Sequence, residues 1–176
     1  MDNSDDPYAP YWPGDDHVDV IGGSVYFWGD SWPFGENVVP PSDFFHTALM
    51  ERNFYESYSE AKGLPMIVVE TASLYNTCDK LDPWTPQCQR NAREGWLGDE
   101  RELAIKEAWW TQVYSTRTAQ AFPLIRSINL FVVTKPEREI AENTVEWGFG
   151  DKPWLRLAFL NHMAQRSIRR SFLLKR

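Results

Sequence analysis

The sequence lacks a continuous apolar run of the roughly 18 residues that a membrane-spanning helix needs. Its first ten residues have neither the basic start nor the apolar stretch of a secretory signal peptide. Basic side chains are also outnumbered, because 18 Lys and Arg face 25 Asp and Glu and give a net charge of −7. Phosphate binding needs a basic face. We therefore expect a soluble protein with neither a membrane nor a nucleic acid as partner.

The end of the chain is basic and carries no acidic residue. Residues 156–176 carry six basic side chains: Arg156, Arg166, Arg169, Arg170, Lys175 and Arg176. A solvated helix end or a chain terminus is the favoured explanation of this pattern, and a contact with anionic lipid or nucleic acid is the alternative. We separate a basic C-terminal tail, 166–176, from the domain expected over 1–165.

Cysteine is scarce, with Cys78 and Cys88 in a polar segment that contains proline and is typical of a loop. Their spacing matches no metal-binding pattern of the C-x₂-C kind. A disulfide that closes this loop is expected if the protein is extracellular, and two free thiols are the alternative. The aspartates near the start do not complete a calcium loop either. We expect no metal and no cofactor.

Aromatic side chains, by contrast, are plentiful, at 15% of residues with nine Trp. A core of this size does not need so many, so some should lie at a surface or a cleft. The flat C–H faces of sugars stack on indole rings, and an acidic, Trp-rich chain is a natural carbohydrate binder. Packing of Trp inside the core is the alternative explanation.

Three short apolar segments, too short for helices, are typical of buried strands. They lie at 18–27, 64–71 and 124–133. Helices are expected over 43–60, 99–121 and 137–142, and from Pro153 onward after a capping Asp151, with an extended segment at 144–149. Buried strands that alternate with amphipathic helices predict βαβ units, and therefore an α/β fold with a parallel sheet.

The working groups of parallel α/β folds gather at the carboxyl ends of the strands. Glu70 ends the second expected strand after four apolar residues, while Tyr26 and Trp28 end the first. Trp32 follows shortly after, and Asn129 lies in the third strand. A carboxylate among Tyr and Trp side chains suggests glycosidic chemistry, and a structural carboxylate paired with a basic neighbour is the alternative.

A retaining glycoside hydrolase uses two carboxyl groups about 5 Å apart, one as nucleophile and one as acid and then base. Asp19, within the first strand, and Glu36, in the loop after it, are the other acids nearby. Neither has the strand-end setting of Glu70. The sequence therefore predicts one catalytic carboxylate.

Five sequence blocks, in this order, resemble glycoside hydrolase family 26, and in particular its fungal β-mannanase-like members. The blocks are YWPGDDHVDV (11–20), SVYFWG (24–29), PFGEN (33–37), LPMIVVETA (64–72) and FPLIRSIN (122–129). The resemblance covers about Asp6 to Trp147. It implies that this chain corresponds to the last three βα units of a (β/α)₈ (TIM) barrel, a partial barrel.

The resemblance also implies retaining hydrolysis of a β-mannan-type polysaccharide by a secreted enzyme, with Glu70 as nucleophile and Tyr26 orienting it. Trp28, Trp32 and Asn129 are the candidate substrate contacts. The acid/base Glu of the family follows its fourth strand, ahead of the matched region, so we expect this chain to be weakly active or inactive.

Two positions depart from the pattern, because Val20 and Leu130 stand where family members usually carry Trp and another aromatic residue. A sugar platform is expected to be lost at Leu130. Two alternatives to the enzyme stay open. One is a carbohydrate-binding or vestigial protein without catalysis, and the other is an α/β domain whose Trp residues only pack its core.

Overall fold

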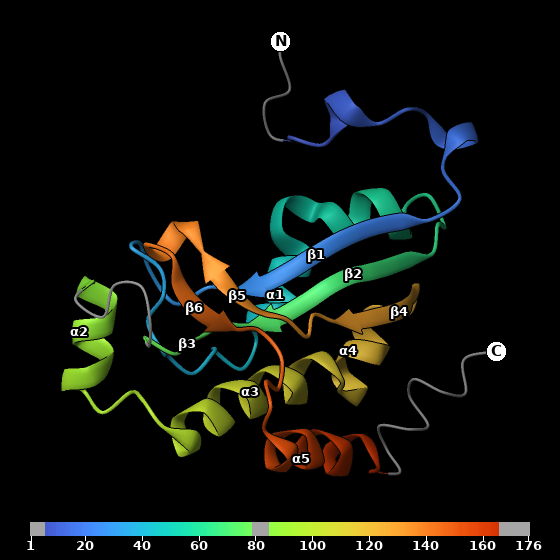
Figure 1. The fold of residues 1–176 in the computed structure, drawn as a ribbon. Coiled ribbons are helices and arrows are strands. Elements are labelled where there is room, and N and C mark those ends of the chain that lie inside the picture. The colour runs from blue at the N-terminus through green and yellow to red at the C-terminus, as the bar shows by residue number, and fades with distance from the viewer. Residues whose placement is uncertain (1–5, 79–84, 166–176) are drawn as a thin grey trace.

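A parallel sheet forms the centre of the molecule. The computed structural model describes residues 6–78 and 85–165, and the expected basic tail lies outside them. Strands β1 (Ile21–Phe27), β2 (Met66–Ser73) and β4 (Ile125–Leu130) are parallel and lie in the order β1-β2-β4 (Figure 1). The expected α/β class with a parallel sheet is therefore confirmed. The sheet is open, and a barrel remains an expectation.

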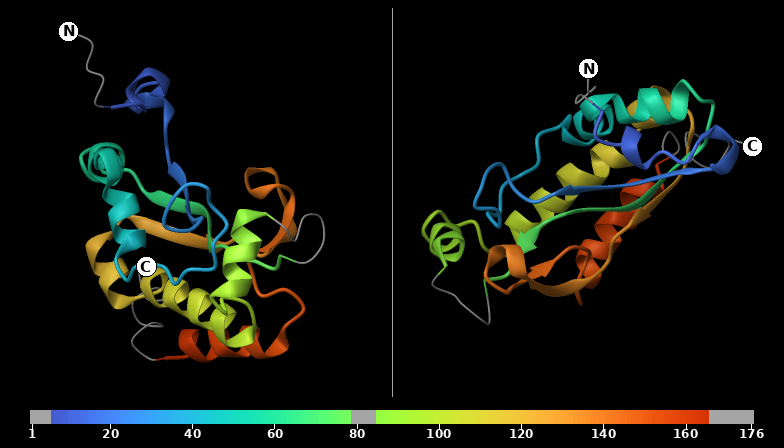
Figure 2. Two further views of the ribbon diagram at one scale, coloured as in Figure 1. Left: turned by 90° about the vertical axis from the view of Figure 1, so that its left-hand side faces the viewer. Right: turned by 90° about the horizontal axis from the view of Figure 1, so that it is seen from above.

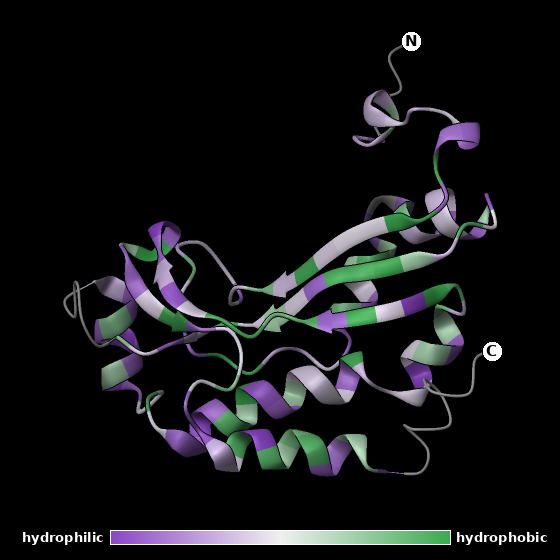
Figure 3. Ribbon diagram, turned by 45° about the vertical axis from the view of Figure 1, so that its right-hand side comes forward, coloured by the Kyte–Doolittle hydropathy of each residue, from purple (hydrophilic) through white to green (hydrophobic). Residues whose placement is uncertain are grey.

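The described chain forms five α-helices. They are α1 (Phe44–Met50), α2 (Pro86–Arg93), α3 (Asp99–Val113), α4 (Thr116–Ala121) and α5 (Pro153–Met163). Figures 1 and 2 show α3 running below the sheet, with α5 packed along it. In Figure 3 hydrophobic and hydrophilic segments alternate along both helices, as expected for helices that bury one side only.

Two of the expected helices are divided. The single helix expected over 43–60 ends as α1 at Met50, and a π-helical segment, Tyr55–Glu60, follows after Asn53 takes a left-handed conformation with φ of 56°. The helix expected over 99–121 divides at Ser115, whose hydroxyl accepts a hydrogen bond from the Thr118 amide at 3.0 Å and caps α4.

Three smaller expectations were also wrong. Strand β1 begins at Ile21 rather than at residue 18, because Asp15–His17 forms a 3₁₀ turn before it. Strand β4 ends at Leu130 rather than at residue 133. Asp151 does not cap α5, since the capping position is Lys152 and no side chain satisfies the first amides there.

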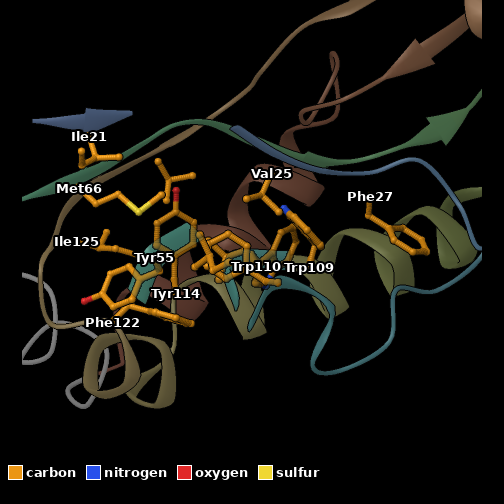
Figure 4. Close-up of a cluster of buried hydrophobic side chains, with 14 of the residues drawn as sticks. Ile21, Val25, Phe27, Tyr55, Met66, Trp109, Trp110, Tyr114, Phe122 and Ile125 are labelled. Carbon is orange, nitrogen blue, oxygen red and sulfur yellow. The ribbon is translucent and has the colours of Figure 1, made fainter. Parts of the chain in front are cut away.

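The side of the sheet that packs against α1, α3 and α4 is apolar, and we call it the covered face. It carries Ile21, Val25, Phe27, Met66, Val68 and Ile125. Together with Trp109, Trp110, Tyr55 and Phe122 from the helices and connections they make the main buried cluster (Figure 4). Burial of this apolar surface is the main source of the protein's stability.

The opposite side of the sheet, the open face, is built from other residue types. It carries Gly22, Ser24, Tyr26, Val69, Glu70 and Asn129. Val69 is 46% exposed and Ser24 is exposed, although both lie within strands. This face is therefore available to a ligand.

A second, antiparallel sheet lies beyond the carboxyl ends of the first and was not predicted. Its order is β3 (Tyr75–Asn76), β6 (Asn143–Glu146), β5 (Thr134–Glu137). β6 overlaps the segment expected to be extended, 144–149, but begins one residue earlier and ends at Glu146. The helix expected over 137–142 is wrong: it is one 3₁₀ turn, Arg138–Ile140, followed by two left-handed residues in the connection between β5 and β6.

Asn37 fastens the long connection between β1 and α1 to the second sheet. Its side chain donates to the carbonyl oxygens of Asn76 at 2.9 Å and of Trp96 at 3.0 Å, and it accepts from the Asn76 amide at 2.7 Å. The Asn37 amide in turn donates to the Asn91 side chain at 2.9 Å. A segment without regular structure is thereby held at both β3 and α2.

A disulfide joins Cys78, after β3, to Cys88 in α2, with the two Cα atoms 5.3 Å apart. It links the second sheet to α2 directly.

Among the described residues, none of the helices combines the length and the apolar character that crossing a membrane requires.

Candidate active site at the carboxyl end of the parallel sheet

A β-bulge places Glu70 on the open face. Val68 pairs with Gly23 and Glu70 pairs with Ser24, so Val69 is an additional residue in β2. A bulge of this kind redirects the side chains that follow it, and bulges are common beside active sites. Glu70 was expected at the end of the strand, but β2 continues to Ser73. The bulge, rather than the strand end, sets the direction of its carboxylate.

Tyr26 and Glu70 meet across the two neighbouring strands. The Tyr26 hydroxyl donates a hydrogen bond of 2.6 Å to Glu70 Oε2. Burial, followed by this bond and by the charges of Glu70 and Glu137, raises the pKa of Tyr26 far above its ordinary value of 10. The phenol therefore stays protonated and keeps donating. Within the described chain, Glu70 Oε1 receives no hydrogen bond.

Aromatic rings form a wall beside this pair. Phe131 and Trp147 contact the Tyr26 ring edge-on, with centroids 5.6 and 5.1 Å away. Trp28, which is half-buried, contacts Trp147 at 4.7 Å. The sequence did not identify Trp147 or Phe131; a sugar platform was expected to be lost at Leu130, the residue before Phe131. The wall therefore joins the end of β1 to the second sheet.

Trp32 lies further out on the connection after β1. Its side chain is 73% exposed, and its ring contacts Phe34 at 5.7 Å. Asn129, the last candidate substrate contact, is exposed on β4 and donates to the Val69 carbonyl oxygen at 3.3 Å. Asn129 therefore lies next to the bulge, and the Trp32 indole is exposed to solvent.

Glu137 supports the wall from behind and was not identified from the sequence. Its Oε1 accepts a hydrogen bond of 2.5 Å from the Trp147 indole and lies 3.1 Å from Lys135 Nζ. Glu137 therefore anchors Trp147 through its carboxylate.

A buried ammonium group joins the wall to α3. Lys106 Nζ donates to the carbonyl oxygens of Ser73, Glu146 and Trp147 at 2.6, 2.6 and 3.1 Å, which uses all three of its hydrogens. Burial lowers the pKa of Lys106 to about 7. Its role is structural, because no hydrogen remains for a substrate.

Glu102 lies beside this lysine and is fully buried. Burial and then a hydrogen bond with Glu146 raise the pKa of Glu102 to about 7, against the opposing effect of Lys152. Lys152 contacts both carboxylates. Two acids and two lysines therefore form one charged cluster between α3, β6 and the start of α5.

The two other acids considered from the sequence do not join Glu70. Glu36 pairs with Arg90 of α2. Asp19 is exposed and precedes β1, so it lies at the opposite end of the sheet. Over residues 6–78 and 85–165, no group of three His, Cys, Asp or Glu side chains is arranged to hold a metal ion.

Comparison of the chain with protein-family models, with curated proteins and with solved structures finds no match. The resemblance to family 26 therefore stays a prediction, and the site is interpreted from its own geometry.

That geometry combines a carboxylate with one fixed and one free oxygen, an exposed indole, and a rigid aromatic wall. A carboxylate oxygen without a hydrogen bond can accept a hydroxyl hydrogen or attack an electrophilic carbon. Aromatic walls with a few fixed polar groups are typical of sites for small organic ligands. The arrangement suits a neutral ligand with hydroxyl groups and apolar faces.

Proposed function

We propose that the open face forms the nucleophile side of a retaining glycoside hydrolase site for a β-mannan-type polysaccharide. The hydrogen bond from Tyr26 to Glu70 carries this proposal. It fixes one oxygen of a carboxylate at a strand bulge and leaves the other for the substrate. In such enzymes the nucleophile forms a glycosyl ester that water then hydrolyses.

Trp32, Trp28 and Asn129 are the proposed substrate contacts. The exposed Trp32 indole offers a face to a sugar ring, whereas Trp28 and the wall behind it limit how the sugar approaches Glu70. Asn129 holds the backbone of the bulge and has its side chain at the surface. Net negative charge is compatible with a neutral polysaccharide. A polysaccharide is therefore the proposed partner.

The second carboxylate decides how much chemistry this chain performs alone. Glu137 and Glu36 are both engaged by basic groups, and Asp19 lies at the far end. Without a second positioned acid among the described residues, the leaving oxygen departs unprotonated, and such proton transfer is typically worth about 10² to 10⁴ in rate. We therefore propose that this chain binds mannan and cleaves it negligibly. Carbohydrate binding without catalysis is the second candidate function, favoured by the same observation.

An activated substrate separates these two functions. Dinitrophenolate is a leaving group that needs no proton, so a 2,4-dinitrophenyl 2-deoxy-2-fluoro-β-mannoside removes the need for the acid. Glu70 Oε1 attacks the anomeric carbon, the bond to the phenolate oxygen breaks with its electron pair, and a glycosyl ester remains. We expect mass spectrometry to find this adduct on Glu70 and none in Glu70→Gln.

Binding is tested separately with mannohexaose by calorimetry. Trp32→Ala should weaken binding about three- to tenfold, the effect of one aromatic contact. Trp154→Ala, a change at another partly exposed Trp on α5, is the matched control and should leave binding unchanged. Binding without an adduct would establish the non-catalytic function. Absence of both would contradict the proposal.

A further inference from the structure

An aromatic pocket of about 250 Å³ lies at the amino end of β1, opposite the end that carries Glu70. In Figures 1 and 3 the segment before β1 lies beyond this end of the sheet, away from the second sheet. Four rings from that segment and from residues 54–58 line the pocket, and Ile21 and Gly22 of β1 line it as well. The rings belong to Tyr8, Trp12, Phe54 and Tyr58, with Tyr11 at the rim.

Asp6 fixes the first part of this pocket. Its carboxylate accepts hydrogen bonds from the Tyr8 amide at 2.9 Å, the Ala9 amide at 3.3 Å and the Tyr58 hydroxyl at 2.7 Å. Tyr8 also packs edge-on against Phe54, with centroids 4.7 Å apart. The segment before β1 is therefore anchored, although it lacks long helices and strands.

Asp15 fixes the second part. It accepts a hydrogen bond from the Trp12 indole at 2.9 Å and pairs with Lys62 at 2.7 Å, while the Lys62 ammonium lies 4.9 Å from the Trp12 ring centre. Trp12 in turn contacts Tyr58 at 5.1 Å. The two charges beside the pocket thus satisfy each other, and the rings are preorganised for a ligand.

Tyr8 and Tyr11 remain available at the rim. The Tyr11 side chain is 85% exposed and that of Tyr8 is 41% exposed. Within the part of the chain that the structure describes, neither hydroxyl has a hydrogen-bond partner. Packing does not account for an exposed phenol held at the mouth of an aromatic pocket, whereas a ligand with an apolar face and hydroxyl groups would use both its ring and its oxygen.

The lining excludes most other ligands. Among the described residues, no charged side chain lines the pocket, which argues against phosphates, nucleotides and charged peptides. Its volume is below the roughly 300 to 1,000 Å³ of pockets for drug-sized ligands, so it fits a group about one ring in size. A polyproline segment rises about 3.1 Å per residue and needs a longer groove. A neutral pyranose ring matches the size, the rings and the hydroxyls.

We propose that this aromatic pocket is a second carbohydrate-binding site, separate from Glu70. The choice of a sugar rests on the proposed function, whereas the pocket itself does not. Gly22 at the pocket and Tyr26 at the candidate active site are four residues apart on β1, or about 13 Å at the rise of a strand. The two sites therefore lie at opposite ends of one strand.

The test is a titration of ¹⁵N-labelled chain with mannohexaose, observed at the Trp12 indole and the amides of residues 8–22 in NMR spectra. Trp12→Phe assigns the indole signal. We expect saturable shifts that Tyr11→Ala weakens about three- to tenfold. The Trp32→Ala and Glu70→Gln variants should leave these shifts unchanged, because their sites lie at the other end of the sheet.

The same titration separates the two proposals. Shifts at Trp32 without shifts at Trp12 would support sugar binding near Glu70 and overturn the second site. Shifts at Trp12 with equal affinity in Tyr11→Ala would also overturn it. Decaproline is the comparison ligand, and saturable shifts with decaproline but not with mannohexaose would replace the sugar by a peptide and refute the inference.

Discussion

The covered face and the open face of the parallel sheet are formed by the same three strands but carry different types of side chain. Val68 on the covered face is fully buried, whereas Val69, the next residue, is 46% exposed on the open face. Large apolar residues fill one face, and Gly, Ser, Tyr, Glu and Asn side chains lie on the other.

This difference separates stability from chemistry. The covered face buries the apolar area that stabilises the fold, so its residues are determined by packing. The open face contributes little to that burial, which allows it to carry a carboxylate, a phenol and a bulge. Substitutions on the two faces should therefore affect different measurements.

The largest expected effect is on the covered side, at Trp109. Its ring is buried against Phe27, Phe44 and Phe45. Trp109→Ala should lower the free energy of unfolding by about 3–5 kcal/mol because it leaves a large cavity. Urea unfolding measures this change, and Trp154→Ala is the control, expected to stay within about 0.5 kcal/mol. Equal losses in the two variants would show that burial of the Trp109 ring does not determine the loss of stability.

The next effect depends on pH and arises in the charged cluster where the covered face meets the second sheet. The pKa of Glu102 is raised to about 7 in the folded protein, so its stabilising contribution is complete below about 4.5, the ordinary value, and is lost as the pH rises through 7. The stability of the protein relative to Glu102→Gln should fall across this range, by up to about 3 kcal/mol.

Unfolding measured at several pH values tests this sign. Glu100→Gln, an exposed carboxylate in the same first turn of α3, is the matched control. Because its side chain is exposed, Glu100→Gln should change the stability by less than Glu102→Gln does. A difference for Glu102→Gln that rises with pH would show that its neighbours Lys106 and Lys152 outweigh burial.

A third comparison uses the adjacent valines of β2. Val68→Ala removes two methyl groups from a fully buried site and should cost about 2 kcal/mol, since each buried carbon contributes about 0.8 kcal/mol and a cavity remains. Val69→Ala should change stability by less than about 0.5 kcal/mol. Thermal or urea unfolding of the two variants measures the two losses of stability. Similar losses would mean that the open face is covered in solution.

The smallest effect is expected at Tyr26. Tyr26→Phe keeps the ring against Trp147 but removes the hydrogen bond to Glu70, and it should cost about 1 kcal/mol. Tyr11→Phe removes a hydroxyl without a partner in the described chain and should cost nothing measurable. The adduct on Glu70 should form more slowly in Tyr26→Phe and at an unchanged rate in Tyr11→Phe. Unchanged adduct formation would remove Tyr26 from the proposed mechanism.

The strands of the parallel sheet were predictable because their burial produces continuous apolar segments, and the order of strands and helices followed from them. Their ends were not, since a 3₁₀ turn before β1 and a left-handed Asn53 depend on local conformations that the apolar pattern does not reveal. The second sheet escaped prediction because β3 has two residues and pairs Tyr75 with Glu146, far away in the sequence.

The candidate site divides in the same way. Glu70 and Tyr26 could be selected because both stand near the ends of apolar segments, and the structure brings their side chains together. Trp147 and Glu137 could not, because the second sheet brings Trp147 beside Tyr26 and Glu137 beside Trp147, and Phe131 lies just past the end of β4. The aromatic composition indicated that rings would gather at a surface without indicating which ones.

The polar contacts of Asn37 have a consequence for proteolysis. The connection between β1 and α1 would ordinarily be a preferred cleavage site, as long irregular segments are. Here three hydrogen bonds of its side chain and one of its amide tie it to β3, α2 and Trp96. A protease must draw an extended stretch of substrate into its cleft, so cutting this connection requires the contacts to open first. The Asn37 amide should exchange slowly with solvent deuterium for the same reason.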